Sequence, residues 1–423
     1  MKYKTFFGKV FKIFNTCLKI MIYRLLYFIL PQHHVCMIYA PSSKRYENLA
    51  IIEFFLKKSL CQIEELNEND CYYTINSSSE IKLWYHYNRI KIFHIYNDTN
   101  LLKVCYYLAC SKVVVLDQTN RVLSVLKIGK NTKCIQAWHG GGLYKKVGFD
   151  AYRHGYSKEK EEIRVRRIHR NIDYFVISDE KLTDKYSSIF RISKSKIIPY
   201  GIPRTDIIYK RDVISDRTNF YERYPSARGK KILVFTPTFR SYVDMRRCCT
   251  DKTNQLQYNY QCCKTHQVIG KYHNYLLDFE LMARELGNEF FLILRKHPTV
   301  QDGYEPQGWI SDTEFPNSLM ISVADILITD YSSILFDFCI TGKPIILYVP
   351  DFKIYEEYER GLYIRPDELA GENNVFYDTE ALVKAIKGNT FTDSTNIFKN
   401  YMSACDGNST SRLVKFIKSF VVS

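Results

Sequence analysis

Apolar runs alternate with periodic apolar stretches along most of the chain after residue 33. Runs with the length of buried parallel strands lie at residues 35–40, 71–75, 90–95, 112–116, 173–178, 196–200, 231–236, 289–294 and 326–329. Apolar side chains at helical spacing follow at residues 48–58, 101–110, 179–190, 275–286 and 334–340. This alternation of strand and helix predicts parallel, doubly wound sheets. The expected fold class is α/β.

A polar stretch divides this pattern into two halves. We expect a first Rossmann-like domain at residues 33–209, a linker at 210–230, a second Rossmann-like domain at 231–395 and a C-terminal helix at 396–423. Two such domains facing each other across a cleft form the GT-B arrangement. Ligands of open α/β sheets bind at the carboxyl ends of the strands, so the residues that follow each strand are the first candidates for function.

Residues 1–32 have a different pattern, in which basic side chains alternate with large apolar ones. No acidic residue precedes Glu47. A basic, aromatic-rich amphipathic segment of this kind is typical of a helix lying in an anionic membrane interface. The apolar run at residues 25–31 is far shorter than the roughly 20 residues that a spanning helix needs. The alternative is a helix that packs against its own domain.

Composition narrows the classes of partner and the compartment. The 423 residues carry a net charge of +15, which indicates an anionic partner such as a phosphate-rich substrate, a membrane surface or nucleic acid. No recognisable nucleic-acid-binding motif accompanies the basic residues, so no nucleic acid is expected as a partner. Thirteen cysteines without a regular framework favour reduced thiols in a cytosol.

A polar insert at residues 241–273 contains two adjacent cysteine pairs, at 248–249 and 262–263. Structural zinc sites usually separate such cysteines by two residues, so a variable loop is favoured over a zinc site. We expect neither a metal nor a cofactor.

Candidate chemistry in the first half begins at Trp138 and His139, which follow a predicted strand. A histidine is the usual base for deprotonating a hydroxyl near neutral pH, although a structural role is the alternative. Gly140 and Gly141 would let the backbone approach a ligand closely. Arg204 follows another strand and either clamps a phosphate or forms a structural ion pair.

The second half repeats this arrangement three times. The strand from residue 231 leads to Pro237, Thr238 and Arg240, and a guanidinium can bind a pyrophosphate in bidentate fashion. The strand at 289–294 delivers Arg295 and His297. After the strand at 326–329, the hydroxyls of Ser332 and Ser333 open a helix, where phosphates bind readily; an N-cap role alone is the alternative for Ser332.

Taken in order, these motifs resemble the CDP-glycerol glycerophosphotransferase family of teichoic acid synthesis. The resemblance rests on Trp138-His-Gly140, Gly201-Ile-Pro-Arg-Thr-Asp206, Thr236-Pro-Thr-Phe-Arg240, Arg295-Lys-His-Pro298, Leu327-Ile-Thr-Asp-Tyr-Ser-Ser333 with Phe336-Asp337, Gly342-Lys-Pro344 and Arg360-Gly-Leu-Tyr363. The chain departs from the family at Gly141 and Gly142, where Thr-Pro is common, and at Phe239, where Trp is frequent.

The resemblance implies transfer of glycerol phosphate, or a similar polyol phosphate, from a CDP-alcohol such as CDP-glycerol or CDP-ribitol to an acceptor hydroxyl, with release of CMP. The acceptor would be a lipid-linked glycan or a growing teichoic acid or capsule polymer. The enzyme would be peripheral, on the cytoplasmic face of the membrane. The first Rossmann-like domain would bind the acceptor and the second the CDP donor.

The resemblance also implies roles for individual residues. His139 is the candidate base and His297 acts at the pyrophosphate, so both are expected to be catalytic. Donor binding is expected from a further set: Trp138, Gly140, Gly141, Arg204, Pro237, Thr238, Arg240, Arg295, Ser332, Ser333 and Asp337.

Two other functions fit parts of the sequence. A GT-B glycosyltransferase that uses a nucleotide sugar would share the cleft and the diphosphate-binding groups, but it would transfer a sugar by attack at carbon. A non-catalytic protein that binds a membrane or nucleic acid through its charge would leave both strand-end histidines without a role.

Overall fold

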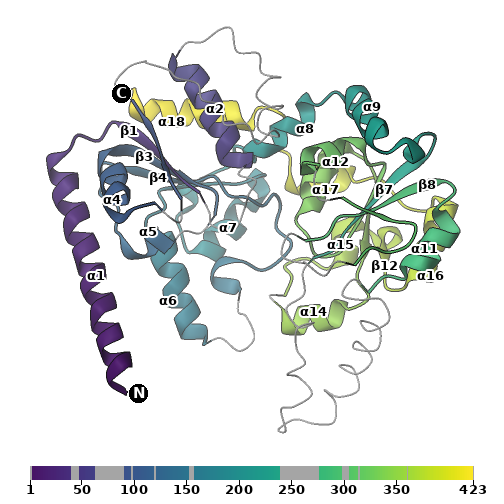
Figure 1. Cartoon of the computed structure of the whole chain (residues 1–423), viewed down its shortest axis with the longest axis horizontal. Coiled ribbons are helices and arrows are strands. Elements are labelled where there is room, and N and C mark those ends of the chain that lie inside the picture. The colour runs from purple at the N-terminus through teal and green to yellow at the C-terminus, as the bar shows by residue number, and fades with distance from the viewer. Residues whose placement is uncertain are drawn as a thin grey trace. The chain divides into compact units, whose positions relative to one another are not determined.

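The computed structural model describes residues 2–39, 47–61, 90–96, 99–118, 121–151, 157–238, 276–297, 304–312, 315–359 and 361–422. The chain divides into two compact units. Unit 1 consists of Met1–Gly141, Ser157–Lys210 and Ser403–Ser423, and unit 2 of Gly142–Tyr156 and Arg211–Met402. Each unit holds one six-stranded sheet. Figure 1 shows β1, β3 and β4 in the sheet of one unit and β7, β8 and β12 in that of the other. The predicted strand at 71–75 and the insert at 241–273 lie outside the described residues.

The sheet of unit 1 has the strand order β2-β1-β3-β4-β5-β6, and all its pairs are parallel. Its strands are β1 (His34–Ile38), β2 (Ile92–Ile95), β3 (Ser111–Leu116), β4 (Lys133–Gln136), β5 (Tyr174–Val176) and β6 (Ile197–Ile198). Cys36 of β1 pairs with Phe93 on one side and Val114 on the other. The near-continuous apolar character of β1 and β3 fits their burial on both faces.

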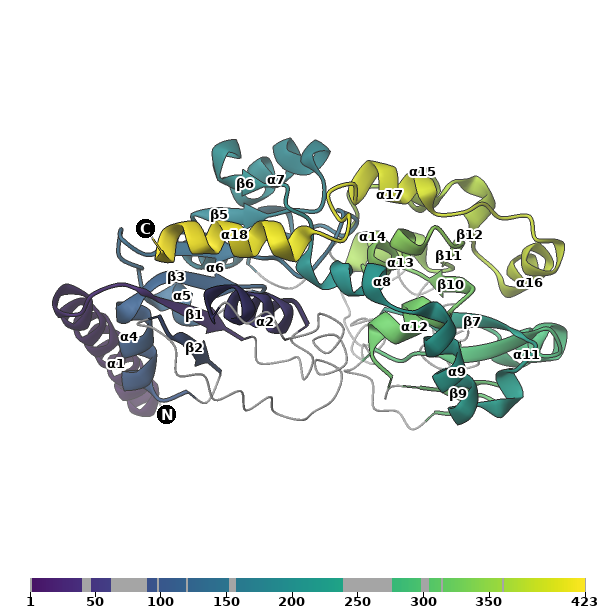
Figure 2. The same ribbon diagram turned by 90° about the horizontal axis from the view of Figure 1, so that it is seen from above.

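Helices cover the faces of this sheet. They are α2 (Glu47–Cys61), α4 (Leu101–Cys110), α5 (Arg121–Val125), α6 (Lys158–His169), α7 (Thr183–Phe190), α8 (Asp206–Lys210) and α18 (Ser409–Val421). Leu49 and Ile52 of α2 and Leu413 and Ile417 of α18 share one apolar core with the strands. Figures 1 and 2 show α2 and α18 side by side against the sheet, so the last helix of the chain completes the first unit.

The first helix, α1 (Lys2–Ile29), packs against α4 through one face. The buried hydroxyl of Tyr23 accepts a hydrogen bond from the Gly129 N–H, and the hydroxyl of Tyr27 accepts one from the Asn131 N–H, both at 2.9 Å. None of the helices within the described ranges is both long enough and apolar enough to cross a membrane.

Unit 2 has a second parallel sheet with the order β12-β11-β10-β7-β8-β9. Its strands are β7 (Lys231–Thr236), β8 (Phe290–Leu294), β9 (Ile310–Ser311), β10 (Ile326–Thr329), β11 (Ile345–Tyr348) and β12 (Val375–Phe376). Its helices are α9 (Val213–Arg223), α11 (Phe279–Leu286), α12 (Asn317–Val323), α13 (Ile334–Phe338), α14 (Phe352–Tyr358), α15 (Pro366–Ala370), α16 (Thr379–Gly388) and α17 (Thr395–Tyr401). Helix α9 occupies much of the stretch predicted as a linker and belongs to unit 2.

Each unit includes a segment from the other half of the chain: residues 142–156 belong to unit 2, and residues 403–423 belong to unit 1. Residues 142–151 leave the first half and form part of unit 2, where Gly142 has a φ of +56°. A Cβ on Gly142 would lie 2.1 Å from the Phe336 ring, so only glycine allows this close approach. This loop pairs with the segment after residue 360. Lys145 and Leu362 form an isolated antiparallel β-bridge, and the Lys146 N–H donates to the Gly361 carbonyl.

Candidate active site

The carboxyl edge of the unit 1 sheet presents His139, which lies just beyond β4 and is exposed. Its Nδ1 lies 3.0 Å from the backbone carbonyl oxygen of Asp117, which follows the neighbouring strand β3. Because a carbonyl oxygen can only accept, Nδ1 carries the hydrogen and Nε2 keeps its lone pair. The backbone of one strand end thus selects the histidine tautomer that can act as a base at Nε2.

The residue before His139 adopts an unusual backbone conformation. Trp138 has a φ of +54°, in the left-handed region that non-glycine residues rarely occupy. Its carbonyl accepts a hydrogen bond of 2.6 Å from Asn48, and its indole packs against Phe175 and Phe190. These contacts hold the strained backbone and therefore set the direction in which His139 points. The structure gives Trp138 a packing role, and its contact with the donor stays a prediction.

Arg204 lies in the same cluster, after β6. Its backbone N–H donates to the Asn48 side-chain oxygen at 2.8 Å, and its guanidinium donates to the His139 carbonyl. The structure thus brings together Trp138, His139 and Arg204, with Gly140 and Gly141 next in the chain. Asn48 joins them, although sequence reasoning did not select it, because an asparagine at the start of a helix carries no local sign of a partner 90 residues away.

Asp117 is a second group that sequence reasoning missed. Only 6% of its surface is exposed, and among the residues that the structure describes its Oδ1 has no hydrogen-bond partner. Burial raises the pKa of Asp117 to about 6, although Arg204 acts in the opposite direction. A buried carboxylate of this kind weakens the fold, and groups with such a raised pKa cluster at functional sites, so Asp117 is a candidate functional residue.

Replacing Asp117 with asparagine is expected to stabilise the protein at neutral pH. The pKa is about 6 in the folded chain against 3.8 ordinarily, so the cost of the charge begins near pH 4 and is complete above pH 6. At about 1.4 kcal/mol per pKa unit, the full cost is about 3 kcal/mol. Chemical denaturation at two pH values measures it: the gain from Asp117→Asn should be about 2 kcal/mol larger at pH 7.5 than at pH 4. A gain that is equal at both values would contradict this.

The carboxyl edge of the unit 2 sheet is organised by Asp330, which follows β10 and is 1% exposed. Its carboxylate accepts hydrogen bonds from the Thr238 N–H at 2.9 Å and 3.0 Å and from the Thr238 hydroxyl at 2.6 Å. The Tyr331 N–H lies 2.5 Å away. Since Thr238 follows β7, Asp330 ties together the ends of two adjacent strands.

The hydrogen bonds between Thr238 and Asp330 lie where doubly wound sheets bind ligands. From β7 the chain continues to β8 on one side, and then crosses to β10 on the other side. The topological switch point is therefore between β7 and β10, next to Thr238 and Asp330. Sequence reasoning gave Thr238 a role but none to Asp330, because the partner that explains it is 92 residues away.

The buried side chain of Tyr331 anchors the turn that follows Asp330. Its ring stacks on Tyr355 with centroids 3.6 Å apart, and its hydroxyl donates to the Asp351 carboxylate at 2.9 Å. These contacts place Ser332 and Ser333 at the sheet edge, just before α13. The Ser333 side chain makes no capping hydrogen bond, and the Ile334 N–H lies 3.5 Å from the Ser332 hydroxyl, so neither hydroxyl is a strong helix cap. Asp337 is buried within α13.

His297 is exposed beyond β8, the next strand of the same edge. Partial burial and the nearby Lys145 lower the pKa of His297, while Asp330 opposes them. Arg295, two residues earlier, is buried and donates to the Asn317 side chain and the Phe315 carbonyl. Unit 2 thus gathers Pro237, Thr238, Arg295, His297, Ser332, Ser333 and Asp337, while Arg240 lies outside the described residues.

Two Rossmann-like units, with a histidine on one sheet edge and hydroxyls and a histidine on the other, are the arrangement of GT-B-like proteins. Residues 44–419 match the family model CDP-Glycerol:Poly(glycerophosphate) glycerophosphotransferase, and the chain belongs to this family. The match confirms the predicted family and enzyme class: transfer of a polyol phosphate from a CDP-linked donor.

Relatives and solved structures agree with the family. The chain is 28% identical to a teichoic acid glycerol-phosphate primase of Bacillus subtilis over 77% of this chain and 78% of the relative. It is also 28% identical to a teichoic acid poly(glycerol phosphate) polymerase of Bacillus spizizenii, over 74% and 76% of the two chains. The structure of the wall teichoic acid polymerase TagF aligns with a TM-score of 0.70 at 16% identity, covering 100% of this chain and 98% of that one. This likeness confirms the GT-B-like fold.

Proposed function

We propose that this enzyme transfers glycerol phosphate, or ribitol phosphate, from the CDP-alcohol to a terminal hydroxyl of a lipid-linked glycan or a growing teichoic acid or capsule polymer. The acceptor oxygen attacks the β-phosphorus and forms the new O–P bond. The bond from that phosphorus to the bridging oxygen breaks, and CMP leaves with the electron pair. The proton of the acceptor hydroxyl passes to Nε2 of His139.

One observation carries the proposal for the base. The hydrogen bond between His139 and the Asp117 carbonyl leaves the Nε2 lone pair as the basic site, on a sheet edge that can receive an acceptor. A merely structural histidine at a strand end would not need its neighbouring backbone strained at Trp138.

The second unit supplies groups suited to the donor. Thr238, Ser332 and Ser333 offer hydroxyls at the switch point of the sheet, and His297 with Lys145 offers positive charge when protonated. We assign the pyrophosphate of the CDP-alcohol to this edge. Arg240, Arg295 and Asp337 stay predicted donor residues.

Release of CMP from CDP-glycerol and from CDP-ribitol tests the reaction, with a membrane lipid extract as the source of acceptor. Turnover of one donor would identify the polyol. The rival function makes a different prediction, because a glycosyltransferase would be inactive with both CDP-alcohols and would turn over a UDP- or CMP-sugar. That result would overturn the proposed function.

We also infer that the enzyme binds the cytoplasmic face of the membrane through α1. Beyond the face that packs on α4, this helix presents an exposed row of Met21, Leu25, Phe28 and Ile29, with Phe28 90% exposed. Arg24 is exposed within the same row. Apolar side chains flanked by cations match the acyl boundary and the anionic headgroups of a lipid surface.

Replacing Leu25 and Phe28 together with serine is expected to weaken binding to vesicles that contain phosphatidylglycerol by about 10²- to 10⁴-fold, since each apolar side chain contributes roughly 1.5–3 kcal/mol when fully buried and about 1.4 kcal/mol is a factor of ten in affinity. Co-sedimentation with vesicles measures the change. Ile214→Ser serves as the matched control, because Ile214 is 81% exposed but lies in unit 2. Equal binding of the double variant and the control would exclude α1 as the anchor.

A further inference from the structure

The sheet of unit 1 has its own topological switch point, which the assigned residues do not occupy. From β1 the chain continues to β2 on one side, and then returns to place β3 on the other side of β1. Ligands of such sheets bind outside the carboxyl ends of the two strands at the switch. Tyr39 follows β1 and Asp117 follows β3, so these two side chains mark the expected crevice.

The opposite half of the same edge is closed by the returning C-terminal segment. The Ala404 N–H donates to the Ser178 carbonyl beyond β5, and the Ser403 N–H donates to the Asp179 carboxylate. Arg412 donates to the Tyr200 carbonyl beyond β6 at 2.9 Å and 3.0 Å.

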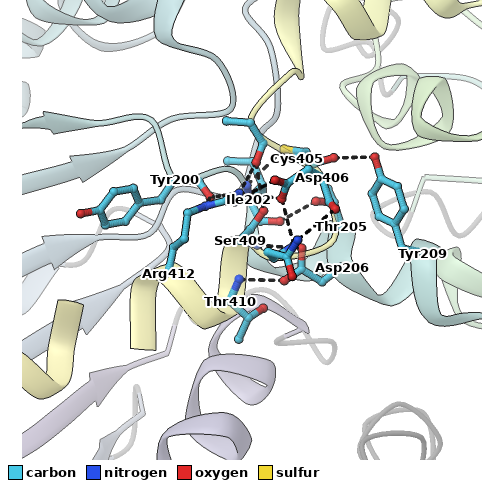
Figure 3. A network of polar contacts seen from close by, with 12 residues as sticks. Tyr200, Ile202, Thr205, Asp206, Tyr209, Cys405, Asp406, Ser409, Thr410 and Arg412 are labelled. Carbon is cyan, nitrogen blue, oxygen red and sulfur yellow. Dashed lines mark hydrogen bonds and ion pairs between the residues drawn. The ribbon is translucent and has the colours of Figure 1, made fainter. Parts of the chain in front are cut away.

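Asp206 locks this segment in place. Its carboxylate accepts the N–H groups of Ser409 and Thr410 at the start of α18, at 3.1 Å and 2.7 Å, as Figure 3 shows. The C-terminal segment therefore occupies the edge beyond β5 and β6. The part of the edge left for a ligand near His139 is the one formed by the ends of β3, β1 and β2.

The side chains on that side suit a hydroxyl-rich ligand. Tyr96, which follows β2, stacks on Tyr39 with ring centroids 4.9 Å apart and is itself 43% exposed. Aromatic faces with a few placed polar groups are the usual lining of small-molecule sites. The Tyr39 hydroxyl donates to Glu53 at 2.9 Å, and His94 lies 3.0 Å from the same carboxylate oxygen.

The polar groups at this place are suited to hydroxyl groups. Glu53 pairs with Lys57 at 2.5 Å, and the buried Asp117 carboxyl is under the influence of the Arg204 guanidinium. Oδ1 of Asp117 is buried without a hydrogen-bond partner among the described residues, so the carboxylate keeps acceptor capacity that the protein does not use. The backbone carbonyl of the same residue holds Nδ1 of His139, so the Asp117 residue and the proposed base are neighbours at this sheet edge.

We propose that Tyr96 and Asp117 form the subsite for the terminal saccharide or polyol unit of the acceptor: the exposed Tyr96 ring stacks on its apolar face, and the Asp117 carboxylate receives one of its hydroxyls. This assignment rests on the proposed function, because His139 can deprotonate only a hydroxyl within about 2.6–3.2 Å of Nε2. Tyr39 and Glu53 position the Tyr96 ring rather than contacting the acceptor.

Steady-state kinetics of the full chain separates the acceptor from the donor. Tyr96→Ala and Asp117→Asn should each raise the half-saturating concentration of a membrane lipid extract at least 10-fold. The half-saturating concentration of CDP-glycerol should change less than twofold. Tyr106→Ala is the matched control, since Tyr106 is also 43% exposed and lies on α4 of the same unit. Folded Tyr96→Ala and Asp117→Asn variants with unchanged acceptor saturation would overturn the subsite.

A second measurement keeps the two proposals distinguishable. Saturation-transfer NMR with glycerol, ribitol and methyl N-acetylglucosaminide needs no donor and no turnover. Signal from at least one of these probes is expected with the wild-type chain and with Tyr106→Ala, and its loss with Tyr96→Ala. Absence of signal from all three probes with the wild-type chain refutes the subsite. Inactivity towards both CDP-alcohols, with the NMR signal present, refutes the proposed reaction alone.

Discussion

Exchange of His139 for alanine is expected to lower the rate of CMP release by about 10²- to 10⁴-fold, the usual contribution of a positioned general base. The hydrogen bond from Nδ1 to the Asp117 carbonyl places the basic Nε2 lone pair on the sheet edge, and alanine removes it without touching the core, because His139 is exposed. The unfolding transition should therefore stay close to that of the wild-type chain.

The measurement is single-turnover CMP release with CDP-glycerol or CDP-ribitol, whichever donor the wild-type enzyme accepts. His33→Ala is a suitable control: His33 lies just before β1, at the amino end of the sheet, where ligands are not expected. A His139→Ala variant that retains more than about a tenth of wild-type turnover would remove this residue from the mechanism.

The second large effect is expected from Asp330→Ala. The change leaves the Thr238 N–H, the Thr238 hydroxyl and the Tyr331 N–H without their carboxylate, in a place that is 1% exposed. Each buried donor without a partner costs about 1–3 kcal/mol, so the loss of partners for three donors should lower the free energy of unfolding by at least about 3 kcal/mol. The ends of β7 and β10 would separate, and affinity for CDP-glycerol should fall with them.

Chemical denaturation measures the stability, and calorimetric titration with CDP-glycerol measures the affinity. Thr238→Val removes only the hydroxyl donor and should cost about 1 kcal/mol, which keeps a folded variant available for the titration. Asp378→Ala is the control within unit 2, since its side chain caps α16 with a single bond to the Ala381 N–H and its removal should cost about 1 kcal/mol without affecting CDP-glycerol. If Asp330→Ala and Asp378→Ala lowered the free energy of unfolding and the affinity for CDP-glycerol equally, the proposed importance of the Asp330–Thr238 hydrogen bonds would be contradicted.

The domain boundaries differ from those that the local sequence pattern predicts. The stretch at 210–230 is polar enough to suggest a linker, yet α9 forms there, because Phe220 is buried against Phe291 and Phe315 of unit 2. Likewise, the C-terminal segment predicted at 396–423 is divided between the units. Met402 ends unit 2, and the following residues return to the sheet of unit 1.

Local sequence pattern was sufficient to predict many of the helices and strands and the chemistry at their ends. Residues 326–329 form β10 as predicted, and the predicted run at 112–116 lies within β3, because apolar runs buried on both faces depend on neighbours a few residues away. The motifs around His139, Thr238 and Ser332 were recognisable for the same reason, and the family match confirms the reaction class that they imply.

Which strand ends are neighbours is visible in the three-dimensional fold alone. Strand order places Asp330 against Thr238 and Asp117 against His139, and α2 brings Asn48 to Trp138. These partners lie far apart along the chain, so no local propensity encodes their contact; it follows from how the crossovers arrange the strands around each switch point. The residues that sequence reasoning missed, Asn48, Asp117 and Asp330, are those whose roles depend on such partners.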